Sequence, residues 1–97
     1  MKLPEKLTVF GMDFRVCDSH EDSEGYSGYC CFETNTIYVN PEQPVREQMV
    51  TLLHELGHAV FKRCSINQVV DENIEEIIVD NMAIAICENF QIKILER

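Results

Sequence analysis

The segment LLHELGH, Leu52–His58, decides how the whole chain is interpreted. Two histidines and a glutamate interrupt a stretch that otherwise has the apolar character of a buried helix. Imidazole and carboxylate groups are costly to bury unless they are hydrogen-bonded or bound to a metal. The segment therefore requires either polar partners or a metal ion, and the rest of the sequence must supply them.

The two histidines are spaced for a helix. His54 and His58 are four residues apart, so on a helix both project from one face and can reach one ion. Apolar residues recur around them at helical spacing, namely Val45, Met49, Leu52, Leu53, Leu56 and Val60. This pattern predicts a helix that starts beside Pro44, which suits a first helical turn, and runs to Lys62 or Arg63.

The spacing His54-Glu55-x-x-His58 also has a chemical meaning. Two neutral imidazoles and one carboxylate suit zinc and leave one coordination position for a water molecule that the metal activates. Glu55 lies about 100° around the helix from His54, where it can take the proton of that water and deliver it to a leaving amine. Gly57, which costs about 1 kcal/mol in a helix interior, predicts close approach of another segment.

The third ligand is expected from a second helix, predicted over Asp71–Phe90 with Asp71 or Asn73 as its cap. This helix is apolar on most sides, so it is expected to lie in the core. Its available carboxylates are Glu72, Glu75, Glu76 and Asp80.

We choose Glu76 as the ligand. Asp80 lies four residues further on the same face and can accept a hydrogen bond from the far nitrogen of a liganding histidine, which fixes the tautomer of that histidine. Glu75 is the second choice, because it lies about 100° around the helix and loses the partnership with Asp80.

The remaining segments predict strands and loops. Leu7–Cys17 suggests two short strands joined by a tight turn, and Tyr29–Asn40 suggests a second hairpin whose turn places Asn35 at positive φ. Asp18–Gly28 is expected to be an exposed acidic loop, and the tail Gln91–Arg97 fits a helical turn or a short strand equally. The fold class is α+β, a minimal zincin. Three or four strands form a small antiparallel sheet packed against the HExxH helix and the glutamate-bearing helix, in a single domain over residues 1–97.

Composition limits the partners. Eight basic and seventeen acidic residues give a net charge of −9, which opposes binding to nucleic-acid backbones or anionic lipid. The start of the chain lacks the pattern of a signal peptide, and no apolar run approaches the roughly 20 residues that span a bilayer. We expect a cytoplasmic protein whose cysteines are reduced thiols, because they are odd in number and lack CxxC spacing. They are Cys17, Cys30, Cys31, Cys64 and Cys87.

Other polar residues are given ordinary roles. His20, within the acidic loop, is expected to be solvated rather than a fourth ligand. Tyr26, Tyr29 and Tyr38 could include a hydroxyl that stabilises an oxyanion, but tyrosines in strands usually pack, so no role is assigned to them.

The run TLLHELGHAVF, preceded by TIYVN and followed by a helix carrying EIIVDNMA, resembles the gluzincin metallopeptidases. Within them it is most similar to the small ImmA/IrrE-type zinc peptidase domains of bacteria, phages and mobile elements, over residues 28–90. The resemblance implies His54, His58 and Glu76 as zinc ligands, Glu55 as catalytic base and Asp80 as the partner of a ligand. It also implies a transcriptional repressor as substrate.

Three functions follow from these patterns. The first is a zinc-dependent endopeptidase that cleaves a cytosolic protein, with the sheet edge near Ile37–Val39 pairing with an extended substrate. The second is a non-catalytic, metal-stabilised binding or regulatory module of a phage or mobile element. Larger members of the family carry a Leu-Leu-Met-Pro-like segment where this chain has Ile94–Arg97, so a shallow cleft is expected. The third is a metal-free domain in which the two histidines hydrogen-bond to Glu76 and Asp80. Glu55 favours the enzyme, because a purely structural metal site needs no water-activating base.

Overall fold

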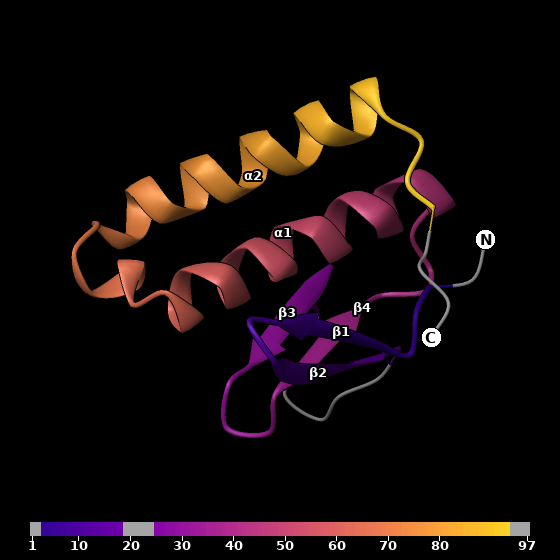
Figure 1. Cartoon of the computed structure of the whole chain (residues 1–97). Helices are drawn as coiled ribbons and strands as arrows, with labels where there is room; N and C mark the ends of the chain where they lie inside the picture. The colour runs from indigo at the N-terminus through magenta and orange to yellow at the C-terminus, as the bar shows by residue number, and fades with distance from the viewer. Residues whose placement is uncertain (1–2, 19–24, 94–97) are drawn as a thin grey trace.

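The computed structural model describes residues 3–18 and 25–93 (Figure 1). Its elements, in chain order, are β1 (Lys6–Val9), β2 (Met12–Cys17), β3 (Gly28–Cys31), β4 (Thr36–Val39), α1 (Val45–Arg63), the short 3-10 helix η1 (Ile66–Gln68) and α2 (Glu72–Asn89). Both predicted hairpins and both predicted helices are present. The α+β class is therefore confirmed.

The four strands form one mixed sheet in the order β1-β2-β4-β3. The two hairpin pairs, β1 with β2 and β3 with β4, are antiparallel, whereas β2 and β4 are parallel, with Val16 opposite Ile37. We expected antiparallel pairing throughout. The parallel pair arises because the chain skips one position between β2 and β3, and β4 then returns to fill it.

This strand order corrects the predicted sheet edge. The segment Ile37–Val39 lies in β4, which is paired on both sides and is buried along its whole length. It offers no free edge to a substrate. Among the described residues, the edge strand on that side of the sheet is β3.

The hairpin turns use residues with positive φ. Phe10 (φ 49°) and Gly11 (φ 83°) form the two-residue turn between β1 and β2, and Asn35 (φ 48°) ends the turn between β3 and β4, as predicted. Arg63, the last residue of α1, donates from Nη2 to the carbonyl oxygen of Phe10 at 3.2 Å. This bond ties the first hairpin to the end of the long helix.

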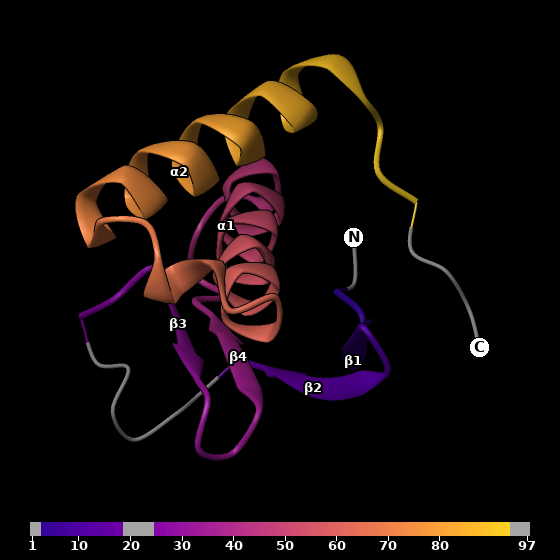
Figure 2. The ribbon, with the colours of Figure 1, turned by 60° about the vertical axis from the view of Figure 1, so that its left-hand side comes forward.

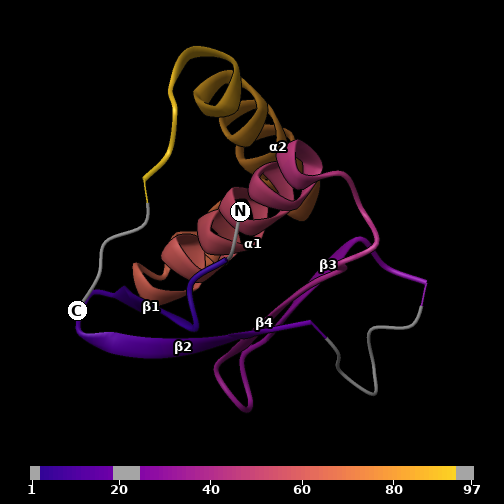
Figure 3. The same ribbon diagram turned by 90° about the vertical axis from the view of Figure 1, so that its right-hand side faces the viewer.

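Helix α1 is the middle layer of the molecule. Figures 1 and 2 show the sheet on one side of α1 and α2 on the other, and Figure 3 shows the same arrangement from the side. The sheet contributes Phe14, Ile37 and Val39 to the main core, and α1 contributes Leu52 and Ala59. One helix therefore carries the histidines and also contacts both other layers.

Helix α2 does not lie in the core, and that prediction was wrong. It packs principally on α1, and within its described length only Val79 and Ala83 are buried. Other apolar side chains of α2, among them Ile74, Ile77 and Ile84, are exposed, because no further layer covers them among residues 3–18 and 25–93. Its N-terminus is capped by Asp71, whose side chain accepts from the backbone N–H of Asn73 at 2.8 Å.

Neither helix of the described chain combines the length and the apolar character that crossing a membrane requires.

Candidate metal centre

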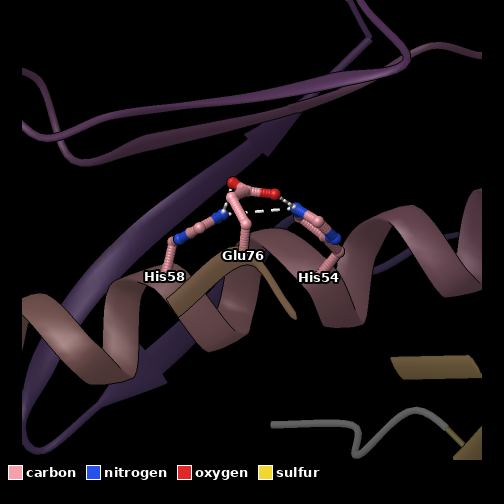
Figure 4. Close-up of side chains that lie close together, drawn as sticks. All are labelled: His54, His58 and Glu76. Carbon is pink, nitrogen blue, oxygen red and sulfur yellow. Dashed lines mark hydrogen bonds and ion pairs between the residues drawn. The ribbon is translucent and has the colours of Figure 1, made fainter. Parts of the chain in front are cut away.

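The structure brings His54, His58 and Glu76 together, with one ligand atom of each within 4.8 Å of the others (Figure 4). The two Nε2 atoms are 3.2 Å apart. The Glu76 carboxylate spans both rings, with Oε1 2.7 Å from Nε2 of His58 and Oε2 3.3 Å from Nε2 of His54. All three side chains thus direct a ligand atom toward one point between α1 and α2.

These spacings fit a tetrahedral metal ion. Ligand atoms about 2.0–2.1 Å from zinc stand about 3.3 Å from one another at the tetrahedral angle. The separations of 3.2 and 3.3 Å from Nε2 of His54 to Nε2 of His58 and to Oε2 of Glu76 are close to this value, whereas the 2.7 Å contact of His58 is made to the other oxygen of the Glu76 carboxylate. The donor set of two imidazoles and one carboxylate also suits a divalent ion of the zinc type.

Each histidine directs its other nitrogen at a second carboxylate. Nδ1 of His54 lies 3.5 Å from Oδ1 of Asp80, the carboxylate that the sequence analysis paired with a liganding histidine. Nδ1 of His58 lies 2.5 Å from Oε2 of Glu75, a contact that the sequence interpretation missed. The EE pair is the signal for it: on a helix, two adjacent glutamates place one carboxylate toward the ligand atoms and the other behind them. Such partners fix the tautomer and the ring orientation of a liganding histidine.

The two glutamates differ in burial as well as in direction. The Glu75 side chain is 14% exposed and the Glu76 side chain is 53% exposed. Burial by itself lowers the pKa of His58. The hydrogen bond that His58 donates to Glu75 and the charges of Glu55 and Glu76 together outweigh burial, so the pKa of His58 is raised overall.

Glu55 is the most deeply buried carboxylate of this region, with 9% of its surface exposed. Desolvation raises the pKa of its carboxyl group. The charges of His54 and His58 lower that pKa, and the charge of Glu76 raises it further. Glu55 interacts electrostatically with His54, His58 and Glu76 and so lies near them. Its carboxylate is not one of the three groups whose ligand atoms converge.

The edge strand β3 runs close to Glu55 at Gly28. A Cβ atom at Gly28 would lie 3.2 Å from Oε2 of Glu55 and 3.1 Å from the carbonyl oxygen of Tyr38, and it would overlap the Thr51 side chain. Only glycine fits this approach, and a glycine at the start of a strand is the sequence signal that could have shown it.

A hydrogen-bonded network fixes the position of this approach. Gln43 Nε2 donates to the carbonyl oxygen of Ser27 at 3.1 Å, and the Gln43 side-chain oxygen accepts from Thr51 Oγ1 at 3.1 Å. The segment leading into β3 is therefore tied to α1 one turn before Glu55.

Gly57 is explained by the packing of the two helices. A Cβ atom there would lie 2.8 Å from Cγ1 and 3.0 Å from Cβ of Val79 on α2. The predicted close approach is therefore confirmed. It brings α2 near enough for Glu76 to reach both histidines.

The other candidate residues that the structure describes are not in this cluster. His20 lies outside the described residues. Tyr38 is buried in the central strand, and Tyr26 stacks on Tyr29 with ring centroids 6.0 Å apart. All five cysteines are free thiols, as expected.

In the comparison with known protein families, residues 6–85 match the model of a peptidase family described as the IrrE N-terminal-like domain. Comparison with curated proteins and with solved structures gives no significant match. The matched residues include every strand, the whole of α1 and most of α2.

Proposed function

Because the chain belongs to the family of IrrE N-terminal-like peptidase domains, we propose that it is a zinc-dependent endopeptidase in which Glu55 is the general base. Membership confirms the resemblance to ImmA/IrrE-type domains and supports a metallopeptidase-like fold. The identity of the metal, the catalytic step and the substrate are parts of the proposal.

One observation carries the proposal: a buried carboxylate with no place among the converging ligand atoms lies beside three groups spaced for a metal. A structural metal site has no use for such a group, and burying a carboxylate is unfavourable for the fold. A hydrolase requires it, because a water molecule must lose a proton as it attacks.

His54, His58 and Glu76 would hold the ion, with Asp80 and Glu75 orienting the two rings. When bound, zinc supplies Lewis acidity, which makes nearby water more acidic and polarises a carbonyl oxygen. Glu55 accepts the proton of the attacking water on its carboxylate and then donates it to the nitrogen of the departing amine. Its raised pKa suits both steps, because transfer in each direction is most efficient when the pKa of the group lies near the working pH.

Strand β3 is the proposed docking edge for the substrate. Among the described residues it pairs only with β4, so its outer edge can accept an extended peptide as a further strand. Gly28 on this strand lies against Glu55, so a peptide paired there would run past the base. The proposed substrate is a cytosolic protein with a basic surface, which the net charge of −9 would attract. A transcriptional repressor is the specific candidate.

The first test is metal content and thermal stability of the wild type beside Glu55→Gln and His58→Ala. We expect one zinc per chain in the wild type and in Glu55→Gln, and none in His58→Ala. A chelator should lower the melting temperature of the first two proteins only. Absence of stoichiometric metal, with melting unchanged by chelator, would show that the histidines are merely hydrogen-bonded to carboxylates.

The second test separates an enzyme from a binding module. Zinc-loaded wild type and Glu55→Gln are incubated with a library of basic peptides, and the new termini are identified by mass spectrometry. Cleavage by the wild type alone supports the proposal. Cleavage that persists in Glu55→Gln contradicts the role of the base, and absence of cleavage by either protein favours the metal-stabilised binding module.

A further inference from the structure

The side of α2 that faces away from α1 carries large apolar residues in contact with solvent. We call this the α2 outer face, and it consists of Ile74, Ile77, Ile78, Met82 and Ile84. Their exposure runs from 40% to 62%, on three turns of one helix. Single exposed apolar residues are ordinary, but a contiguous set of this kind marks an interaction surface.

A groove extends this surface toward α1. It has a volume of about 250 Å³, its walls are almost wholly apolar, and Ile78 and Met82 stand at its rim on α2. Leu56 and Val60 line its other side, on the flank of α1 that points away from the histidines. The groove therefore lies across the helix pair from the candidate metal centre.

Every charged residue of α2, and of the segment 64–71 that leads into it, is acidic. Residues 64–92 contain no lysine, arginine or histidine. Three of the carboxylates on α2 belong to the candidate metal centre. The other two, Glu72 and Glu88, stand near the two ends of the helix, and Asp71 caps its N-terminus. A second copy of the chain would place acidic groups against acidic groups, which opposes self-association through this helix.

We propose that the α2 outer face and its groove dock an amphipathic helix of another protein, whose apolar stripe is flanked by lysines and arginines. An apolar stripe at i, i+3, i+4 and i+7 fits between two helices, and the flanking cations would meet the acidic ends of α2. This inference is independent of the proposed peptidase activity, because none of the five residues is a proposed ligand or base.

The test uses a labelled synthetic peptide of about 18 residues, long enough for several helical turns, built from leucine, lysine and alanine with one leucine stripe. Binding to the full chain is followed by fluorescence anisotropy. Two controls share its length: an isomer with the leucines scattered around the helix, and a version with glutamate in place of every lysine. We expect the striped basic peptide to bind about tenfold or more tightly than either control, a difference of about 1.4 kcal/mol.

The surface is mapped with the double variant Ile78→Ser/Met82→Ser, whose fold is checked by circular dichroism and metal content. We expect it to bind the striped peptide about tenfold more weakly. The matched control is Val69→Ser, since Val69 is 82% exposed but lies outside the face. The variant Glu55→Gln should bind the peptide like the wild type, so loss of peptidase activity does not affect this test.

Three results would overturn the proposal. Equal binding of the striped and scattered peptides would show attraction by charge alone. Binding unchanged in the double variant would place the contact elsewhere. Dimerisation of the wild type in analytical ultracentrifugation, abolished by the double variant, would make a second copy the occupant.

Discussion

Replacing Gly57 with alanine tests whether the contact between the helices sets the position of the proposed ligand Glu76. In an exposed helix, glycine to alanine stabilises a protein by about 1 kcal/mol. At Gly57 the new methyl group would meet Val79, whose Cγ1 and Cβ would be only 2.8 and 3.0 Å away. Valine in a helix is held in one rotamer, so its side chain cannot rotate aside. Helix α2 must move instead.

The size of the movement follows from the distances. Carbon atoms pack at about 3.5 Å or more, so α2 must withdraw by about 0.7 Å at Val79. Overpacking of this kind costs about 1–3 kcal/mol, which exceeds the gain in helix propensity. We expect Gly57→Ala to be destabilised by about 1 kcal/mol, which lowers the melting temperature by about 4–8 °C for a domain of this size. Glu76 lies one turn from Val79 and should withdraw with it. Metal–ligand distances in protein sites vary by only about 0.2 Å, so we expect the withdrawal of Glu76 to lower metal affinity about tenfold or more.

Chemical denaturation and competition with a zinc chelator measure the two effects, and a double-mutant cycle assigns them. Val79→Ala alone should cost about 2 kcal/mol, from two lost methyl groups and the space that they leave. In Gly57→Ala/Val79→Ala the methyl at position 57 occupies part of that space. We expect the double variant to be about 1–2 kcal/mol more stable than the sum of the two single effects, with metal affinity partly restored.

The reasoning fails if Gly57→Ala is more stable than the wild type and binds metal equally well. That result would mean that α2 is free to shift without moving Glu76. Additive effects in the cycle would mean that the methyl group at position 57 does not meet Val79 at all.

Three further predictions concern single side chains of the same region. Glu75→Gln should weaken zinc binding about 10–100-fold, because it removes the carboxylate that orients the proposed ligand His58. Glu72→Gln makes the same charge change at an exposed position of α2 and should leave zinc binding unchanged. Equal effects of the two variants would mean that Glu75 acts only through its charge. Zinc must displace the proton of His58. Burial lowers the pKa of this residue, but the Glu75 hydrogen bond and the charges of Glu55 and Glu76 together outweigh burial and raise it. As pH falls, zinc affinity should therefore begin to decline at a higher pH than it would for a histidine with an ordinary pKa. Zinc affinity that is constant from pH 8 to about pH 5.5 would contradict this. Burial and the charge of Glu55 raise the pKa of the Cys30 thiol to about 12, whereas a hydrogen bond with Thr34 lowers the pKa of the Cys31 thiol. Iodoacetamide near neutral pH should therefore label Cys31 before Cys30. Tandem mass spectrometry distinguishes the two positions, and equal labelling of both would contradict the prediction.

The features predicted correctly from sequence are those that depend on neighbours along the chain. The bounds of α1 follow from apolar spacing between Pro44 and Arg63, and the convergence of His54 and His58 follows from their separation on one helix. The turns at Gly11 and Asn35 follow from the same local rules. Such features need no knowledge of how distant segments pack.

The features that were missed depend on distant contacts. The edge strand of the sheet is β3, whereas the sequence analysis expected the edge near Ile37–Val39 in β4. No local sequence signal specifies that the chain skips one strand position between β2 and β3. The contact of Glu75 with His58 is set by the rotation of α2 against α1, and that rotation is fixed where Gly57 meets Val79. The apolar character of α2 predicted burial, but the sequence does not say how many layers will cover a helix.

The middle position of α1 also has a consequence for how the chain folds. The proposed ligands and the carboxylates that orient them all lie between residues 54 and 80, on two helices joined by residues 64–71. The main core instead joins residues as distant as Val9 and Ala59. Short loops close with little loss of entropy, so the helix pair should form before the sheet docks beneath it. A metal bridging His58 and Glu76 would then act as a cross-link does, restricting the unfolded chain and favouring the helix pair before any substrate is met.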